Sequence, residues 1–458
     1  MLTELRIKNF KTWKDTGNIR LAPLTVVFGV NSAGKSSLGH LLLALKQTTL
    51  STDRRRALHL GDSNSLIDLG TFKDCIFNHD IEHPLSFRLA WRLPKSLEVK
   101  DPLAISRRFR GDELVLDVSI KANRVGQPEV TNLEFDLRDK GISSLDIAYK
   151  RNETGQYDLH SETYKFTKTP GRQWPLGEPE KFYRISEQSR ARFQNAGFLS
   201  DFALSTEELL GHFYYLGPLR DYPQRIYQWS GDTPEDVGQK GEYAIAAILA
   251  AQSQRRELNR GPKRQIQPFA EFIATWLKDI KIIHSFSVKQ VAEGRKEYEV
   301  LVKTHAKGSE VKITDVGFGV SQVLPPIVEA FYCRPGSVVW MEQPEIHLHP
   351  QVQAELADVF ISAIKARENW MDRNIQIIVE SHSEHFLNRL QRRIAEQIIS
   401  PNDVAIYFCK RHDVAAELET LKVNLFGEIE NWPENFFGDE MADLTARTVA
   451  AMKRKQQE

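Results

Sequence analysis

The chain has 458 residues, of which 41% are hydrophobic and 27% are charged. This composition is typical of a globular protein with either one large α/β core or several domains, and it excludes a mostly disordered chain. Lys and Arg together number 61, and so do Asp and Glu. The overall charge therefore gives no reason to expect a nucleic-acid or membrane partner, and such binding would need a local patch.

Cysteine spacing and hydropathy favour a cytoplasmic protein. Cys75, Cys333 and Cys409 are far apart and form no CxxC pair, which argues against both a disulfide framework and a zinc ribbon. The N-terminal residues alternate like a strand and lack the apolar core of a signal peptide. We also find no run of about 18 apolar residues that would predict a membrane span.

The first half of the chain predicts a strand, a glycine-containing loop and a helix, followed by a β-rich region. Residues 24–28 form a short apolar run of buried-strand type, which Gly29 ends. Residues 36–46 are helix-forming apart from Gly39. Short alternating runs separated by turn residues predict strands between residues 70 and 170.

The second half predicts a return to α/β alternation. We expect a strand at residues 213–216, a helix at 244–258 and a hairpin at 282–302 with Gly294 in its turn. Strands are then predicted at 337–341, 375–379 and 404–409, with helices at 351–367 and 384–397. Strands separated by helices of this length predict parallel pairing with helical crossovers, and we expect the strand before Gly29 to join the same sheet.

Residues 29–36 match the phosphate-binding pattern G-x-x-x-x-G-K-[ST], between a predicted strand and a predicted helix. Glycines let the backbone curl so that N–H groups and the helix N-terminus face phosphates. In this pattern Lys35 reaches the β and γ phosphates and Ser36 holds Mg²⁺. We therefore predict ATP and Mg²⁺ as ligands, with nucleotide contacts from Asn31, Ser32, Ala33, Gly34, Lys35, Ser36 and Ser37.

An apolar strand ending in Glu342 predicts a second part of the site, because ligands bind at the carboxyl ends of parallel strands. We expect Glu342, with Ser36, to contribute to Mg²⁺ coordination. Gln343 follows where two successive acidic residues are commoner; it can position water but cannot accept a proton. Either Glu345 supplies the missing base, or hydrolysis is slow and the nucleotide acts mainly as a switch.

Histidines occur after both of these late strands. His382 follows the strand at 375–379, where it can donate a hydrogen bond to the γ phosphate. His347 and His349 have a spacing that also suggests metal ligation, but no Cys or His cluster nearby completes a zinc site. His382 is therefore our candidate catalytic histidine.

The segment 314–322 precedes a helix and contains Gly319 and Ser321. These residues can present backbone N–H groups and a hydroxyl to a phosphate from outside. By itself this signal is weak. Its position in the sequence, between the phosphate loop and the Glu342 strand, is what favours a role at the nucleotide.

Together, residues 29–36, 315–322, 338–350 and 379–385 resemble the Walker A, signature, Walker B and switch-histidine motifs of ABC-type ATPase heads. More narrowly, residues 344–350 and 381–385 resemble prokaryotic AAA-family ATPases related to RecF, SMC and the OLD nucleases. Residues 215–223 and 427–437 are similar to the DUF3696 subgroup, and residues 95–205 are matched only loosely.

The resemblance implies an α/β fold: a P-loop NTPase head with a mixed or parallel core sheet, helical crossovers and a β-rich lobe with insertions. It implies the following parts: residues 1–95, the N-terminal head with Walker A; 96–210, a β-rich insertion; 211–330, a second lobe with the signature; 331–410, the C-terminal head with Walker B; and 411–458, a DUF3696-like tail.

The resemblance also implies partners. In such heads two copies pack face to face, so Ser321 of one copy would act on ATP held by the other in a homodimer or larger assembly. Members of this group commonly serve as ATPase subunits of anti-phage systems, as the PtuA-type ATPases do beside an HNH nuclease. The segment after Cys409 contains no D-x-D or HNH-like cluster, so we expect any nuclease to be a separate chain.

Two other functions stay open: a RecF-like repair ATPase that binds DNA itself, and a nucleotide-dependent scaffold with little turnover. The basic runs at 54–56, 107–110 and 255–264 could contact phosphates, although such runs are more often solvated faces or interface rims. Arg220 is assigned either to the nucleotide site or to the lobe interface. Trp432, Phe436 and Phe437 are expected to anchor the tail.

Overall fold

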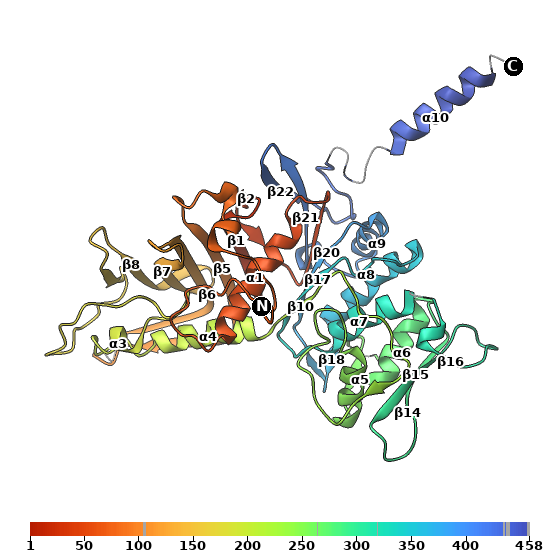
Figure 1. Ribbon diagram of the computed structural model, residues 1–458, viewed down its shortest axis with the longest axis horizontal. Coiled ribbons are helices and arrows are strands. Elements are labelled where there is room, and N and C mark those ends of the chain that lie inside the picture. Colours follow the sequence, from red (N-terminus) through yellow and green to blue (C-terminus); the bar gives the residue numbers. More distant parts are fainter. Residues whose placement is uncertain (104–106, 263, 318, 434–435, 437–439, 456–458) are drawn as a thin grey trace.

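The computed structural model describes residues 1–103, 107–262, 264–317, 319–433, 436 and 440–455 (Figure 1). Its central sheet has six strands in the order β10 (Phe213–Leu216), β17 (Val338–Glu342), β20 (Gln376–Glu380), β4 (Leu24–Gly29), β21 (Val404–His412) and β22 (Ala415–Leu421). The first five strands are parallel, and only β22 runs antiparallel to its neighbour. The predicted placement of the Gly29 strand among the late strands is confirmed.

The central strands are buried on both faces, which explains their continuous apolar sequences. Val338 and Trp340 of β17 belong to the core that includes helix α1 (Lys35–Leu50). Val339 and Met341, which point the other way, belong to a second core. That core includes the helices α7 (Gly319–Tyr332), α8 (Pro350–Lys365) and α9 (Glu384–Ala395).

A second, antiparallel sheet covers the α1 side and extends away from the central sheet (Figure 1). It confirms the predicted β-rich region, and it also recruits the N-terminal strand. Its strands are β2 (Trp13–Asp15), β1 (Leu2–Phe10), β5 (Leu85–Lys100), β6 (Arg108–Ala122), β7 (Pro128–Asp139), β8 (Ile142–Arg151) and β9 (Tyr157–His160), with β3 (Ile19–Arg20) beside β1. The helix α4 (Leu199–Gly211) packs against α1.

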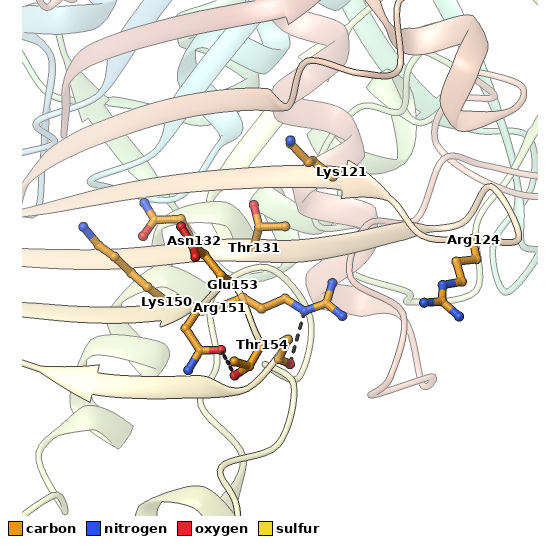
Figure 2. A pocket seen from close by; sticks show the side chains of 10 residues that line it. Lys121, Arg124, Thr131, Asn132, Lys150, Arg151, Glu153 and Thr154 are labelled. Atoms are coloured by element: carbon orange, nitrogen blue, oxygen red, sulfur yellow. Dashed lines mark hydrogen bonds between the residues drawn. The ribbon is translucent and has the colours of Figure 1, made fainter.

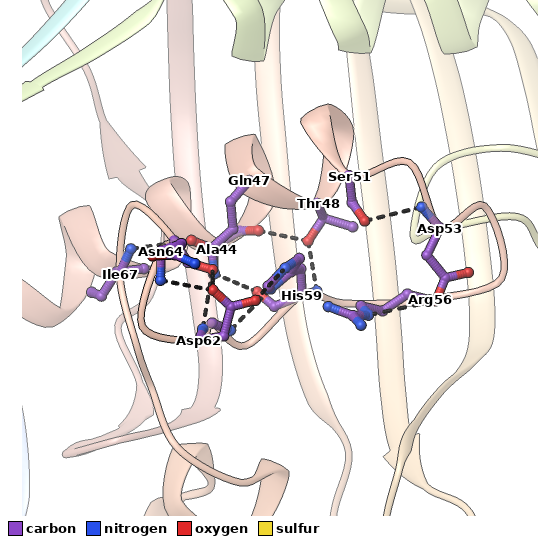
Figure 3. A network of polar contacts seen from close by, with 12 residues as sticks. Ala44, Gln47, Thr48, Ser51, Asp53, Arg56, His59, Asp62, Asn64 and Ile67 are labelled. Atoms are coloured by element: carbon purple, nitrogen blue, oxygen red, sulfur yellow. Dashed lines mark hydrogen bonds and ion pairs between the residues drawn. The ribbon is translucent and has the colours of Figure 1, made fainter.

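The loop that leaves α1 is tied back to the same helix (Figure 3). Gln47 donates from Nε2 to the carbonyl of His59 and accepts from the backbone N–H of Ile67. The hydroxyl of Thr48 accepts from the backbone N–H of His59. These bonds satisfy buried polar groups that would otherwise lack partners, and they hold the loop along the helix.

A third region contains α5 (Ala244–Ser253), α6 (Phe269–Asp279) and a small sheet, at the lower right of Figure 1. Its hairpin is built from β14 (Ser285–Gln290) and β15 (Glu297–Lys303), with Gly294 at φ 79° in the turn, as predicted. The strands β11 (Tyr227–Gln228) and β16 (Val311–Lys312) complete the sheet.

Three predicted helices end earlier than expected, and the one predicted at 384–397 stops at Ala395. The helix predicted at 244–258 stops at Ser253, because Arg255 takes a left-handed φ of 53° and the chain enters β12 (Glu257–Asn259). The helix predicted to reach residue 367 stops at Lys365, because the chain continues into β18 (Arg367–Glu368), which pairs with β12. The remaining strands of this small sheet are β13 (Gln267–Pro268) and β19 (Met371–Asp372).

Two basic side chains of the run at 255–264, Arg256 and Arg260, make structural contacts, whereas Arg255 and Arg264 are exposed. Arg256 donates to both carboxylate oxygens of Glu368, at 2.7 and 3.0 Å. Arg260 pairs with Asp279 at 2.6 Å and lies over the ring of Trp276. These contacts join β12 to α6 and β18, whereas Lys263 of this run lies outside the described residues.

The tail packs against the central sheet through Phe436. Its ring lies 4.7 Å from that of Phe408 and 5.6 Å from that of Phe28, the residue before Gly29, and Trp432 lies 5.1 Å from it. The predicted anchoring role of Phe436 is confirmed, whereas Trp432 is 50% exposed and contacts Phe436 within the tail itself. Residues 434, 435 and 437 lie outside the described residues. The helix α10 (Glu440–Lys455) then extends away from the body of the molecule (Figure 1).

The described part also contains two short helices, α2 (Phe72–Cys75) and α3 (Glu187–Arg190). Among the helices that the structure describes, none combines the length and the apolar character needed to cross a bilayer.

Candidate functional site

The candidate site lies where three parallel strands end. Glu342, at the end of β17, is the register partner of Glu380, at the end of β20. The next residue, Ser381, donates its backbone N–H to the carbonyl of Val27 in β4, at 3.1 Å. Parallel strands bring their carboxyl ends to one edge, so both carboxylates emerge beside the loop that begins at Gly29.

The loop needs its glycines for steric reasons. Gly29 and Gly34 have φ values of 149° and 92°. A β-carbon on Gly29 would lie 2.2 Å from the carbonyl oxygen of Cys409, and one on Gly34 would lie 2.3 Å from Oγ1 of Thr12. α1 begins at Lys35 without a side-chain cap, so no capping side chain competes with an anion for the helix N-terminus. The N–H of Ser37 donates to the carbonyl of Gly34 at 3.2 Å.

Other predicted loop residues occupy different environments. Asn31 and Ser32 are exposed, and Ser32 has a left-handed φ of 59°. Ala33 is buried. Ser37 is also buried: its hydroxyl accepts from the indole N–H of Trp13 at 2.9 Å and donates to the carbonyl of Gly34. The Ser37 side chain thus stabilises the loop through its contacts with Trp13 and Gly34.

Lys35 is buried and directed back across the loop. Its ammonium group donates to the carbonyls of Gly29 and Val30 at 3.0 and 2.9 Å. Burial lowers the pKa of Lys35, and the carboxylate of Glu380 opposes this shift. A cation placed beside the helix N-terminus suits a polyphosphate.

Ser36, Glu342 and Glu380 together form a set of oxygen ligands. Ser36 Oγ donates to Glu380 Oε1 at 3.0 Å, and Tyr215 Oη donates to Glu342 Oε1 at 2.5 Å. Nε2 of His40 lies 3.7 Å from the same Glu342 oxygen. Hydroxyl and carboxylate oxygens are the donors that Mg²⁺ prefers.

The electrostatics of these carboxyl groups fit a divalent cation. Burial raises the pKa of Glu342, opposed by hydrogen bonds from Tyr215 and Ser36. Burial and then the negative charge of Glu342 raise the pKa of Glu380 to about 8. Oε2 of Glu380 is buried and has no hydrogen-bond partner among the described residues. A cation would offset this repulsion, so the residues present fit Mg²⁺.

Glu380 was not among the sequence-predicted site residues. The signal that could have found it is the pairing of strand ends: a carboxylate closes the predicted strand at 375–379 just as Glu342 closes its own. Glu380 and Ser36, which share a hydrogen bond, are 344 residues apart in the sequence. Their proximity could therefore be predicted only once the order of the strands was known.

Glu345 is joined to the segment that carries His382. Its Oε1 accepts from the hydroxyl of Ser381 at 2.8 Å and from the backbone N–H of His382 at 2.7 Å. Its Oε2 is buried without a hydrogen-bond partner in the described part of the chain, and burial raises its pKa. Glu345 therefore positions His382, with one carboxylate oxygen left for another contact.

Gln343 and His382 line the same edge. Gln343 has a left-handed φ of 44°, and its backbone N–H continues the sheet by donating to the carbonyl of Glu380 at 2.8 Å. Burial, followed by the charge of Lys35, lowers the pKa of His382 to about 4. At neutral pH this imidazole is uncharged and has one N–H to donate.

The predicted signature residues lie at the start of α7. Gly319 opens the helix close to Leu348, and Asp315 and Gly317 before it are exposed. Ser321 is buried and lines a cavity of about 30 Å³ with residues that include Asp221 and Tyr222. Phe318 lies outside the described residues.

The histidine pair at 347 and 349 has a structural contact. Nδ1 of His349 accepts from the backbone N–H of Gln351 at 3.3 Å and caps α8. His347 has a left-handed φ of 61°. Within the described residues, no group of three or more His, Cys, Asp or Glu side chains has a metal-binding arrangement.

Two family comparisons match separate parts of the chain. Residues 235–387 match the AAA ATPase domain family, and residues 399–446 match a family described as a protein of unknown function, DUF3696. The first match includes Ser321, Glu342 and His382. These matches confirm the AAA-type and DUF3696 resemblance. The search of curated proteins gives no significant match.

Among solved structures, the chain is similar to three SMC head domains, each of which aligns with 92% of this chain. One is an SMC head bound to the C-terminal winged-helix domain of ScpA, with a TM-score of 0.43, 11% identity and 98% of that chain covered. The head from Thermotoga maritima has a TM-score of 0.41, 10% identity and 99% covered. A third, with an extended coiled coil and bound to the C-terminal domain of ScpA from Pyrococcus furiosus, has a TM-score of 0.43, 9% identity and 96% covered.

Proposed function

Because this chain is an AAA-type ATPase with a DUF3696 segment, we propose that it binds ATP and Mg²⁺ at residues 29–36 and hydrolyses the ATP. The nucleotide state would control a separate effector, a nuclease, in a cytoplasmic anti-phage defence complex. The main support for an ATP site is the hydrogen bond between Ser36 and Glu380, the register partner of Glu342. The defence role rests on the resemblance of residues 215–223 and 427–437.

Each residue at this edge has a role in the proposal. The backbone of residues 29–34 and the start of α1 bind phosphate oxygens, and Lys35 neutralises them. Ser36, Glu342 and Glu380 would hold Mg²⁺, which orients the β and γ phosphates and screens their charge when bound. The uncharged His382 donates a hydrogen bond to the terminal phosphate.

We propose that turnover is slow. Gln343 can orient the attacking water but cannot accept its proton. Glu345 is the nearby alternative base, but one of its carboxylate oxygens already accepts from Ser381 and His382. A long-lived ATP state suits a protein that uses nucleotide binding as a switch.

We further propose that two copies pack face to face over this edge, so that Ser321 of one copy acts on ATP held by the other. Large apolar side chains are exposed in the loop after Gly29 and in the segments near the end of β10, which supports a covering partner. They are Val30, Leu219, Tyr222, Ile226 and Tyr243. Because Ser321 is buried in the single chain, this arrangement requires movement at the start of α7.

Lys35→Ala tests the nucleotide site. The variant should lose ATP binding and turnover while its circular dichroism and melting temperature stay close to the wild type. The exposed Lys14, changed to Ala, is the matched control and should retain both activities. Unaltered turnover in Lys35→Ala would contradict the proposed site.

The effector role needs a separate test. The chain should co-purify with the nuclease encoded beside its gene, and infection of cells that express both should be blocked only when Lys35 is intact. If Lys35→Ala protected infected cells as well as the wild type does, nucleotide binding would not control the effector. The proposal of an ATP site would still stand.

A second candidate function, direct DNA binding, is favoured by one surface groove (Figure 2). It has a volume of about 660 Å³ and lies over the ends of β6, β7 and β8. Lys150 and Arg151 in its wall pair with Glu134 and Glu129, at 2.6 and 2.9 Å. The other basic side chains in the wall are Lys121 and Arg124.

The affinity of the chain for a DNA duplex, measured at several salt concentrations, tests whether it binds DNA directly. A contribution from the groove predicts weaker binding by a double variant, Lys121→Glu with Arg124→Glu. The dependence of log K on log salt should also become shallower, by roughly one for each DNA phosphate that the variant no longer neutralises. Lys95→Glu, an exposed change elsewhere on the same sheet, is the control. Identical salt slopes for the double variant and the wild type would exclude the groove.

A further inference from the structure

Arg220 is a buried cation whose hydrogen-bonding capacity is largely unused. It lies just after β10, and only 8% of its surface is exposed. Nη2 donates to the backbone carbonyl of Glu342 at 3.4 Å. Nε and Nη1 are both buried without a hydrogen-bond partner among the described residues. Buried guanidinium donors without acceptors are costly, so this arrangement indicates an external acceptor.

The backbone around Arg220 is held in place. Gly217 donates its N–H to the carbonyl of Gln239 at 2.8 Å, and Asp221 donates to the carbonyl of Lys240 at 2.9 Å. The preceding strand, β10, runs parallel to β17. Arg220 therefore emerges at the same sheet edge as Glu342, from a segment fixed on both sides.

The charges of Glu342 and Glu345 act on Arg220 and oppose the lowering of its pKa, but among the described residues neither carboxylate accepts a hydrogen bond from it. A guanidinium that served the carboxylate would donate to its oxygens, but Arg220 reaches only the backbone carbonyl of Glu342. The Glu342 carboxylate instead accepts from Tyr215. Burial lowers the pKa of Arg220 to about 10, so the group keeps its positive charge at neutral pH.

We propose that Arg220 donates to the terminal phosphate of ATP bound in the same chain, and so distinguishes ATP from ADP. This inference rests on the proposed nucleotide site. The planar fork of a guanidinium matches two phosphate oxygens. Lys35 and Arg220 would then both contact the triphosphate, and ADP would leave the Arg220 donors unsatisfied.

The test compares two nucleotides on three variants. Calorimetric titrations of the full chain would use Mg²⁺ with either a non-hydrolysable ATP analogue or ADP. Arg220→Met, which keeps the length of the side chain without its charge, should weaken binding of the ATP analogue on the order of 10- to 100-fold, the range expected for a lost charged hydrogen bond. Its ADP affinity should stay within about threefold of the wild type, since ADP lacks the phosphate concerned. Arg220→Lys should recover part of the loss.

The third variant, Lys35→Ala, separates the two proposals. Loss of both nucleotides by Lys35→Ala, with normal binding of the ATP analogue by Arg220→Met, would overturn the role of Arg220 and leave the site intact. Retention of both nucleotides by Lys35→Ala would overturn the site itself. An equal loss of ATP analogue and ADP in Arg220→Met, with Arg220→Lys equally impaired, would assign Arg220 a structural role.

Sedimentation of the same samples excludes an indirect effect through assembly. The Arg220→Met defect in ATP binding should persist at protein concentrations at which the chain is monomeric. A defect confined to associated samples would assign Arg220 to the contact between copies and overturn the proposal.

Discussion

Gly39 of α1 lies against the indole ring of Trp340 in β17. A β-carbon on Gly39 would lie 2.7 Å from Cε2 and 2.8 Å from Nε1 of that ring. The helix that follows the loop at residues 29–34 thus packs directly on the strand that ends in Glu342. The glycine that weakens the predicted helix is what allows this close approach.

Gly39→Ala should therefore destabilise the protein, although alanine favours a helix by about 1 kcal/mol. Overpacking of a buried contact costs about 1–3 kcal/mol, and the rigid indole ring leaves little room for relaxation. Chemical denaturation measures the effect. Gly211, at the end of α4, has open space around its β-position, so Gly211→Ala should leave stability unchanged or slightly raised. A stabilised Gly39→Ala variant would refute the packing argument.

Glu380→Gln should change the pH dependence of stability. Because the folded pKa of Glu380 is raised to about 8, the folded state keeps a proton that the unfolded state releases near pH 4.5. Wild-type stability from this group is therefore lost as pH rises from about 4.5 to 8. Glutamine cannot ionise, so the variant should be more stable than the wild type at pH 8 in EDTA. Parallel stability curves for the two proteins would count against a shared, repulsive carboxylate pair.

The same substitution should weaken Mg²⁺ binding, because it removes a carboxyl group beside Ser36 that would release its proton and become negatively charged when the cation binds. In the presence of ATP, the Mg²⁺ concentration needed for half-maximal thermal stabilisation should rise on the order of 10-fold, equivalent to about 1.4 kcal/mol. Glu384→Gln, on the outer first turn of α9, should leave that concentration unchanged. Equal midpoints for Glu380→Gln and the wild type would mean that Glu380 does not contribute to the cation site.

Gln343→Glu should raise the rate of ATP hydrolysis. A carboxylate at this position can accept the proton of the attacking water, and general-base catalysis contributes about 10²–10⁴-fold in rate. We expect an increase of at least about 10-fold in single-turnover measurements, because the substituted base is not otherwise optimised. Gln343→Ala should give no increase. A slower Gln343→Glu enzyme would favour Glu345 as the base already in use.

His382 should contribute to stability in a defined pH range. Its folded pKa is about 4, below the ordinary value of 6.5, so the unfolded state binds a proton that the folded state does not. Stability from this group is present above about pH 6.5 and is lost as pH falls towards 4. His382→Gln should flatten this part of the stability curve and slow turnover, while His385→Gln, three residues on, should do neither. If His382→Gln lost stability between pH 6.5 and 4 as the wild type does, His382 would not be the group that causes this loss.

Much of the central architecture could be predicted from short stretches of sequence. The strand before Gly29, the helix after it and the late strands at 337–341 and 375–379 all have local signals: apolar runs, glycine breaks and helical periodicity. These signals depend on neighbouring residues, so they survive without knowledge of the fold. Helix ends were less predictable. For example, α5 stops at Ser253 because the chain then enters β12, which pairs with β18, more than 100 residues away in the sequence.

By itself, the sequence determined the glycine-containing loop at residues 29–36, the apolar strand that ends in Glu342 and the position of His382 after a second strand, because each of these is defined by a contiguous pattern. Only the tertiary structure decided that Glu380 contacts Ser36, that Gly39 packs on Trp340, and that Arg220 is buried beside Glu342. These contacts depend on the order and register of parallel strands, and backbone hydrogen bonding between strands carries no signal in the sequence of either strand alone.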